Sequence, residues 1–380
     1  MSNATTTPTP AATTPATSRK LFEAAPDAVS APPCPKTLGL DVSDKLTHFC
    51  LLGADGDLVD EGRMRTREVD ILRRTASFGR CRVVLEVGQH SPWLSRALRS
   101  QGHEVIVANP RQFQLIRESY RKNDHTDAEL LARAGRFDPL LLSPVEHRSA
   151  AQQADIALLR ARHQVVTART QLINVVRGTV KAFGGVLPRW DANTFHHHAP
   201  GGIPAELQDA LLPVIEAIGV LSEKVRHFDR RAEAVIAERY PEAQALQQVN
   251  GVGPITSLTY VLTLGDARRF AKSRQVGPYL GLTPRQRQSG ERDPQLRITK
   301  AGDTSLRRLL VQAAHYILGP FGKDCDLRRW GLAHLEGGGL SHKKRVVVAV
   351  ARKLAVLLHH LLVTGEAYDP FYQQGAAAMA

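Results

Sequence analysis

Four carboxylates in the first 130 residues are placed where they could act together. Asp41 and Glu86 each follow a short apolar run, so each is expected at the end of a buried strand. Asp124 and Asp127 are three residues apart near the expected start of a helix, which lets both face one side. Taken singly, each acid also has an ordinary explanation, as a solvated strand end, a helix N-cap or a first-turn residue. If the two strands are neighbours, all four converge.

A cluster of four carboxylates requires a cation. Without one, mutual repulsion would raise the pKa values of the acids. Mg²⁺ prefers carboxylate oxygen and retains water, and two such ions about 4 Å apart would hold the attacking and leaving oxygens of a phosphodiester. The acids therefore predict Mg²⁺, as two ions, and chemistry on a phosphodiester.

A second chemical candidate is Ser289, which lies in the arginine-rich segment from Arg285 to Arg292. Guanidinium groups bind phosphate oxygens in pairs and stabilise charge that develops during reaction, and Gly290 allows the backbone close to a ligand. Ser289 is thus a candidate nucleophile. An ordinary surface serine is the alternative, because no histidine base is adjacent. A metal-bound hydroxide or a carboxylate from another domain would have to activate it.

The charge of the chain indicates a polyanionic partner. The 380 residues contain 50 Lys plus Arg and 37 Asp plus Glu, a net charge of +13, which disfavours an acid-surfaced metabolic enzyme. Residues 268–308 contain 11 basic and 3 acidic side chains. Nucleic acid is the favoured partner, and a solvated basic face is the alternative. The basic residues expected to contact nucleic acid are Arg268, Arg269, Lys272, Arg274, Arg285, Arg287, Arg292, Arg297, Lys300 and Arg307.

Two glycines add a candidate phosphate contact. Gly251 and Gly253 precede a helix expected to begin at Pro254, so backbone N–H groups there can face an anion, as helix-hairpin-helix elements do toward DNA. Such a Gly-x-Gly also marks ordinary turns.

The elements around the acids predict a mixed α/β sheet, as in ribonuclease-H-like folds. The Asp-Gly step at residues 55–56 is typical of a hairpin, so the first three strands should be antiparallel. Helices at 69–78 and 93–101 then make crossovers that leave later strands parallel to the first. The strands are expected at 38–42, 46–52, 58–64, 83–85 and 105–108.

The remaining chain is expected to be mainly helical. Apolar spacing predicts long helices at 145–183 and 205–240 that form a coiled-coil-like arm suited to self-association; packing of the two helices only against each other is the alternative. The segment that joins them contains His196 to His198, for which a solvated loop is favoured over a metal site. Short helices separated by glycine follow, and 282–300 is expected to be a loop. The predicted domains are a disordered Thr/Pro-rich tail (1–36), a catalytic domain (37–144), the arm (145–240) and a carboxy-terminal domain (241–380).

The remaining composition points to the cytoplasm. The four cysteines are far apart and provide neither a disulfide scaffold nor a zinc ribbon. The apolar stretch 346–363 contains Arg352 and Lys353, which favours a packed helix over a membrane span, so no membrane partner is expected.

The motifs taken together resemble the DEDD transposases of the insertion-sequence-110 (116/902) family, which are bridge-RNA-guided serine recombinases. The resemblance covers nearly the whole folded chain. It departs from the family at Asn123, where Thr is frequent, and at Thr299, where Ser is frequent. The matching motifs are Leu40-Asp41-Val42-Ser43, Leu85-Glu86, Val107-Ala108-Asn109-Pro110, Lys122-Asn123-Asp124, Asp127-Ala128, Asn250-Gly251-Val252-Gly253-Pro254, Gly281-Leu282-Thr283-Pro284, Gln288-Ser289-Gly290 and Thr299-Lys300-Ala301-Gly302.

The resemblance implies roles for these residues. Asp41, Glu86, Asp124 and Asp127 would bind metal, and Ser289 would attack DNA covalently. It also implies a Holliday-junction-resolvase-like catalytic domain, an active site shared between two domains, a homo-oligomer (dimer or tetramer) joined through the arm, a structured guide RNA, and a place in the bacterial cytoplasm with the nucleoid.

Three functions remain in competition at this point. The first is a recombinase that acts through a phosphoserine, and the second is a Mg²⁺-dependent junction-resolving nuclease in which water attacks. The third is a basic nucleic-acid-binding protein that keeps only the scaffold. The complete acid set argues against the third, and Ser289 distinguishes the first from the second.

Overall fold

The computed structural model describes residues 36–109, 124–287, 294 and 296–372. The described chain forms two compact units, which meet in sequence between His147 and Arg148. The tail expected to be disordered lies, apart from Lys36, outside the described residues.

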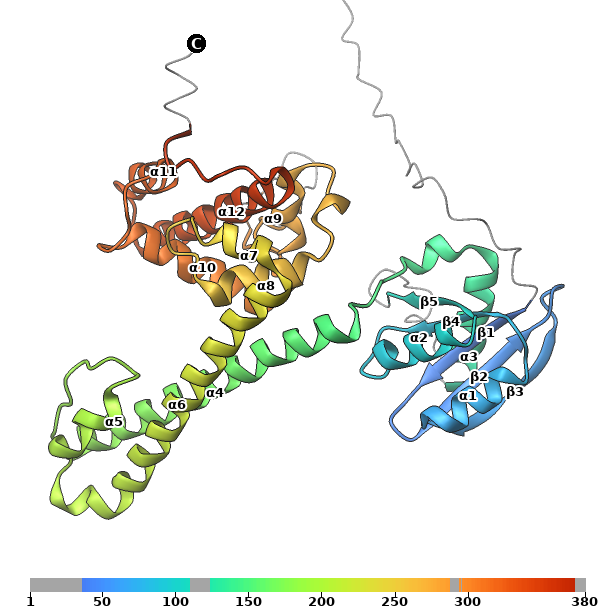
Figure 1. Cartoon of the computed structure of the whole chain (residues 1–380), viewed down its shortest axis with the longest axis horizontal. Coiled ribbons are helices and arrows are strands. Elements are labelled where there is room, and N and C mark those ends of the chain that lie inside the picture. The colour runs from blue at the N-terminus through green and yellow to red at the C-terminus, as the bar shows by residue number, and fades with distance from the viewer. Residues whose placement is uncertain (1–35, 110–123, 288–293, 295, 373–380) are drawn as a thin grey trace, which may run out of the picture. The chain divides into compact units, whose positions relative to one another are not determined.

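The amino-terminal unit contains the expected mixed sheet. Its strands follow the order β3-β2-β1-β4-β5; β1, β2 and β3 are antiparallel neighbours, while β1–β4 and β4–β5 are parallel pairs (Figure 1). The predicted hairpin is also present, because Gly56 adopts a φ of +92° and donates its N–H to the Gly53 carbonyl. The strands are β1 (Thr37–Val42), β2 (Leu46–Leu52), β3 (Leu58–Arg65), β4 (Arg82–Glu86) and β5 (Glu104–Ala108).

Helices cover both faces of this sheet. On one face, α1 (Glu68–Ala76) and α2 (Ser91–Ser100) bury Ile71 and Leu98 against strand residues such as Leu40. On the other face lies α3 (Asp124–Phe137), followed by the short 3₁₀ helix η2 (Pro139–Leu142), and here Leu131 packs against Val84. The sheet is therefore the middle of three layers.

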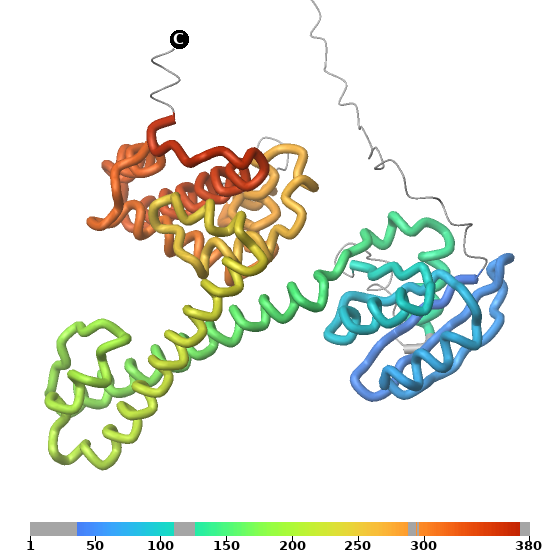
Figure 2. Tube along the Cα trace, in the orientation of Figure 1, coloured from blue at the N-terminus to red at the C-terminus, as the bar shows by residue number. Residues whose placement is uncertain are grey.

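The second unit begins with two long helices that pack side by side, α4 (Ala150–Ala182) and α6 (Gln208–Arg239) (Figure 2). Their polar contacts show that they are antiparallel: Asp155 pairs with Arg239, Arg162 with Asp229, and Arg169 with Ser222. The apolar spacing that predicted α4 does not give a continuous apolar side. In the middle of the helix, Thr170 is exposed and Arg169 is buried.

The segment between these helices is more ordered than expected. Residues 184–204 were expected to form a solvated loop, yet they contain α5 (Phe195–His198) and the 3₁₀ helix η3 (Ala199–Gly202), and η4 (Ala205–Leu207) follows. Phe195 is fully buried and packs with Ile203 against the distal ends of α4 and α6. His197 and His198 are exposed, as predicted, whereas His196 is half-buried beside Gly219 of α6. Apolar residues of the segment thus form a local core.

The carboxy-terminal helices surround α12, which spans Leu340–Thr364. By length and hydropathy α12 is the one described helix that qualifies as a membrane span, but Val350, Leu354 and Leu358 are fully buried, as in a core helix. The same core includes Leu159 of α4 and Ile236 of α6. The elements are α7 (Pro241–Leu246), α8 (Pro254–Leu264), η5 (Ala267–Arg269), η6 (Ser273–Gln275), α9 (Val276–Tyr279), α10 (Thr304–Leu318), α11 (Asp326–Leu335) and α12 (Leu340–Thr364).

Candidate active site

Two of the predicted acids lie side by side. Strands β1 and β4 are parallel neighbours with Leu40 opposite Leu85, so Asp41 and Glu86 are the next residues on each strand. Adjacent strands lie about 4.8 Å apart. The condition set in the sequence analysis, that the first and fourth strands are neighbours, is therefore met, and their pairing brings these two carboxylates to the same end of the sheet.

Both acids also lie on the sheet face that α3 covers. Side chains alternate along a strand, so Asp41 shares the face of Gly39, and Glu86 shares the face of Val84. A Cβ atom added at Gly39 would lie 2.0 Å from the carbonyl oxygen of Ala128 in α3. A Cβ atom added at Gly135 would likewise lie 2.2 Å from Val84. Small residues thus let α3 lie directly on the strands that carry the acids.

The close approach of α3 brings Asp127 toward this end of the sheet. Ala128 contacts Gly39, two residues before Asp41, and Asp127 precedes Ala128 in the helix. The Oδ1 atom of Asp127 is buried. Asp124 begins α3, but its side chain lies outside the described part.

The metal set remains a prediction. Among the described residues, no group of three or more His, Cys, Asp or Glu side chains is arranged to hold a metal ion. The donors at this edge nevertheless fit a hard cation, because Asp41 and Glu86 offer only oxygen. Cys50 lies nearby on the same face, against Ala128. Burial, assisted by Glu129 and Glu61, raises the pKa of the Cys50 thiol to about 11, so the thiol is protonated at neutral pH in the metal-free protein.

The sequence alone did not identify His48 and Arg63 as neighbours of the acids. His48 lies directly opposite Asp41 on β2, and Arg63 lies opposite His48 on β3. Residues directly opposite one another share a sheet face, so a row runs from Arg63 through His48 and Asp41 to Glu86. The short turn at Ser43 fixes the register between β1 and β2, because the Ser43 N–H donates to the Leu46 carbonyl. The length of this turn in the sequence could therefore have placed His48 opposite Asp41.

Ser289 and Arg292 lie outside the described residues, but the structure describes the chain up to Arg287 and again from Leu296. The expected loop at 282–300 is paired at its ends: the Arg285 N–H donates to the Arg297 carbonyl at 3.0 Å, and the Thr299 N–H donates to the Thr283 carbonyl at 2.9 Å. A short antiparallel ladder therefore anchors the Ser289 segment. Arg285, Arg287 and Arg297 are exposed around it.

One predicted nucleic-acid contact has a structural role instead. Arg307 is only 9% exposed and donates to the carbonyl oxygens of Leu280 and Ala301 at 3.1 and 2.7 Å. The same two segments approach at Gly281, where φ is +67° and a Cβ atom would lie 2.3 Å from the Ala301 nitrogen. Arg307 thus ties together the chain on either side of the ladder, because its guanidinium is buried rather than presented to solvent.

The other predicted basic contacts within the described residues face solvent. Arg268, Lys272 and Arg274 are exposed, and so is Arg269, whose guanidinium lies 4.5 Å from the ring centre of Phe270. Lys300 is exposed as well and adopts a φ of +57°. Phosphate contacts require basic side chains that face solvent. That these residues bind nucleic acid stays a prediction.

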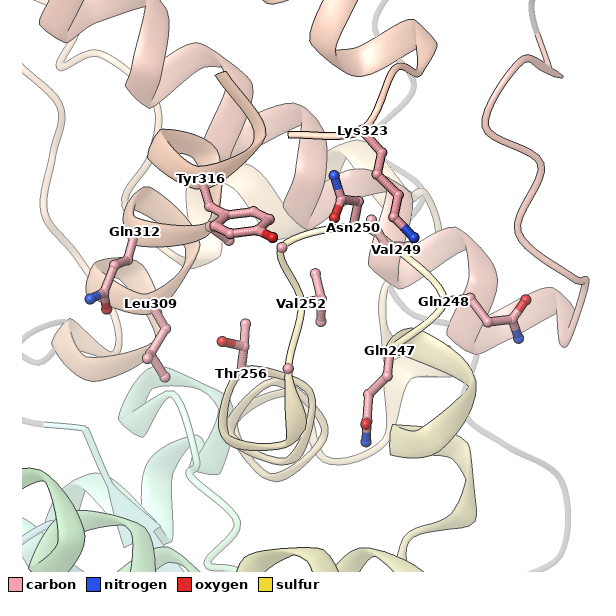
Figure 3. A pocket seen from close by; sticks show the side chains of 13 residues that line it. Gln247, Gln248, Val249, Asn250, Val252, Thr256, Leu309, Gln312, Tyr316 and Lys323 are labelled. Atoms are coloured by element: carbon pink, nitrogen blue, oxygen red, sulfur yellow. The ribbon is translucent and has the colours of Figure 1, made fainter. Parts of the chain in front are cut away.

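The glycine segment before α8 borders a cavity of about 520 Å³ (Figure 3). Gly251 adopts a φ of +85°, which favours glycine, and Gly253 lies at the N-cap of α8. The cavity is open enough for a ligand to reach this segment.

Two family models match the chain. A model described as "Transposase", of the DEDD type, matches residues 38–184, and the model "Transposase IS116/IS110/IS902 family" matches residues 243–321. Together they span more than half of the sequence, and they include Asp41, Glu86, Asp124, Asp127 and Ser289.

Individual relatives agree with these models. The chain is 32% identical to a probable family 20 transposase of Pseudomonas aeruginosa, over 76% of this chain and 86% of the relative. It is 28% identical to the transposase for insertion sequence element IS1111A of Coxiella burnetii, over 88% and 91%. It is 29% identical to the transposase for IS1328 of Yersinia enterocolitica, over 84% and 94%.

Proposed function

The chain belongs to the IS116/IS110/IS902 family of DEDD transposases and is a DNA transposase, and from this premise we propose that it cuts and rejoins DNA through a bond to Ser289. The adjacency of Asp41 and Glu86 under α3 is the observation that supports phosphodiester chemistry, whereas the choice of Ser289 as the attacking group rests on the arginine-rich segment around it. Such an acid edge suits chemistry on a phosphodiester, and Ser289 lies in a second, arginine-rich segment.

The reaction has two balanced steps. The Ser289 oxygen attacks a DNA phosphorus, its proton passes to a base, and the bond from phosphorus to one deoxyribose oxygen breaks; that oxygen takes up a proton. A deoxyribose hydroxyl of the new partner strand then attacks the phosphoserine and releases the serine with its proton restored. The phosphoserine keeps the bond energy that rejoining needs.

Each part of the chain has a role in these steps. Asp41, Glu86, Asp124 and Asp127 would hold Mg²⁺, as two ions, which supplies charge stabilisation at the phosphate when bound. The exposed guanidinium groups of Arg285, Arg287 and Arg297 hold phosphate oxygens near Ser289.

The partners follow from the same proposal. The substrates are the ends of a mobile element and its target, as the names of the Coxiella and Yersinia relatives suggest. A structured guide RNA selects the sites, the protein works as a homo-oligomer joined through the α4–α6 arm, and it acts in the bacterial cytoplasm. The glycine segment before α8 contacts a nucleic-acid backbone in the manner of a helix-hairpin-helix.

The competing candidate is a nuclease in which water attacks. The row of Asp41 and Glu86 favours it equally, because two carboxylates that hold metal serve water as well as serine. The two candidates differ in whether protein becomes joined to DNA.

A trapping assay separates them. End-labelled DNA carrying the element ends is incubated with Mg²⁺ and the full chain with its guide, denatured, and searched for a protease-sensitive adduct on the Ser289 peptide. Ser289→Ala should abolish adduct and recombination, and Ser289→Cys should slow or trap the intermediate. Ser305→Ala, a serine replaced elsewhere in the basic segment, should leave both intact. Recombination without an adduct, or by the Ser289→Ala protein, would assign the chain to the water-attacking nuclease.

A further inference from the structure

The cavity beside the Gly251–Gly253 segment has walls from three elements. The segment after α7 forms one wall, the first turn of α8 with Thr256 forms another, and one face of α10 forms the third (Figure 3). Leu309, Gln312 and Tyr316 are spaced by three and four residues, which places them on that one face of α10. Its volume of about 520 Å³ is typical of a small-ligand site.

The lining has the chemistry of a nucleobase site. Amides carry both donors and acceptors and match base edges, whereas a site for phosphate alone would favour arginine. Among the residues that the structure describes, Lys323 is the one cation that lines the cavity, and no carboxylate lines it. The Nδ2 atom of Asn250 is buried and has no hydrogen-bond partner within the described chain, so this wall of the cavity contains a polar group that the described chain leaves unsatisfied. The polar lining residues are Gln247, Gln248, Asn250, Thr256, Gln312, Tyr316 and Lys323.

Tyr316 supplies an aromatic surface at this site. Its side chain is 47% exposed, although it lies on a helix whose opposite face is buried in the core. The Gly251 backbone packs closely on the ring, since a Cβ atom there would lie 3.3 Å from its Cδ1 atom. A ring held in place and still open to solvent is a platform on which a base can stack.

We infer that this cavity binds one unpaired nucleotide of a nucleic-acid strand. The base stacks on Tyr316, its edge meets the amides of Asn250 and Gln312, and its phosphate lies toward Lys323. The inference rests on the proposed function only in that the chain handles nucleic acid.

A fluorescence experiment tests it directly. The full chain is titrated into duplexes that carry one bulged 2-aminopurine, in a DNA arm and an RNA arm, with EDTA present to prevent cleavage. Stacking on tyrosine quenches 2-aminopurine. Tyr316→Ala should abolish the quench and weaken binding of the bulged duplex about tenfold, the effect of losing one base–aromatic stack, with paired duplex changed less than twofold. Tyr316→Phe should retain the quench and the affinity for the bulged duplex. Gln312→Ala should weaken binding of the bulged duplex and leave binding of the paired duplex unchanged.

Tyr372→Ala is the matched control, because that tyrosine is 68% exposed and lies outside this cavity. Quenching in either arm supports the site and identifies the strand. No quench in both arms, or equal loss for bulged and paired duplex in Tyr316→Ala, overturns it. Intact quenching without recombination would count against the proposed chemistry alone.

Discussion

The carbonyl oxygen of Ala128 lies 2.0 Å from the position that a Cβ atom on Gly39 would occupy. Helix α3 can therefore rest on β1 only where the strand has no side chain. This contact lies two residues from Asp41 and one residue from Asp127, so it sets the spacing between the strand acid and the helix acid.

Gly39→Ala should therefore damage both stability and activity. The contact is with backbone, which cannot turn away, so α3 must shift at a cost of about 1–3 kcal/mol in unfolding free energy. DNA cleavage should fall with it. Gly88→Ala is the control for thermal unfolding, because a Cβ atom there has no neighbour within 4 Å in the described chain. Equal melting temperatures for the two variants would contradict the packing argument.

The acids should be needed for chemistry and dispensable for folding. Asp41→Asn and Glu86→Gln keep side-chain size but weaken metal binding, so Mg²⁺-dependent strand cleavage should fall about 100-fold or more with unfolding unchanged. Glu68→Gln, on α1 over the opposite sheet face, should cleave normally. Normal recombination by Glu86→Gln would remove that residue from the site.

Arg63 should bind the DNA substrate beside Asp41 and Glu86. It is exposed, and it shares the sheet face of Asp41 through His48. Arg63→Gln should raise KM for DNA about fivefold, the effect of roughly 1 kcal/mol for an exposed charge contact, with kcat nearly unchanged. Arg63→Lys should recover most of the affinity. Arg80→Gln is the matched control, because this exposed arginine precedes β4 and so lies at the end of the sheet opposite Glu86. An equal effect there would mean that position on the sheet does not matter.

The basic surface at 268–274 should govern the salt dependence of binding. Replacing Arg268, Arg269, Lys272 and Arg274 by Gln should lower the slope of log affinity against log salt by up to about 3.6 if each contacts one phosphate of duplex DNA. Arg329→Gln removes an arginine already paired with Asp324, so it should change the slope little. An unchanged slope in the fourfold variant would show that this surface faces away from nucleic acid.

The amino-terminal unit should lose stability in mild acid because of His103. Its side chain is 6% exposed, and burial lowers the pKa of its imidazole below the ordinary value of 6.5. The unfolded chain then binds a proton that the folded chain resists, so stability falls as the pH drops below about 6.5. Hydrogen exchange of β4 and β5 at pH 7 and pH 5 should show this. His103→Gln should reduce the difference in protection between pH 7 and pH 5, whereas His227→Gln, at an exposed histidine, should not. The same pH difference in both variants would contradict the role of His103.

The sequence was informative where a pattern is local. Apolar runs, the turn at Gly56 and the intervening helices predicted the mixed sheet, because period and crossover rules depend on nearby residues. They left open whether the strands of Asp41 and Glu86 are neighbours. Packing between distant segments left no such signal. The closeness of Gly39 to Ala128 depends on a helix almost 90 residues away in sequence.

Buried arginines also depend on contacts between distant segments, which the sequence does not reveal. Composition placed Arg307 with the phosphate contacts, since a guanidinium that donates to backbone carbonyls looks the same in sequence as one that binds DNA. The burial of Arg169 was equally hidden, because its partners Asn193 and Ser222 lie 24 and 53 residues away.

The divided interior of the arm has a consequence for protein engineering. Leu159 and Ile236 belong to the carboxy-terminal core, whereas Phe195 and Ile218 form a separate core at the far end. A cut at Pro241 would therefore open the carboxy-terminal core. The distal end has its own core and is joined to the rest through a polar middle, so exchanging residues 173–218 between relatives should leave the carboxy-terminal core intact.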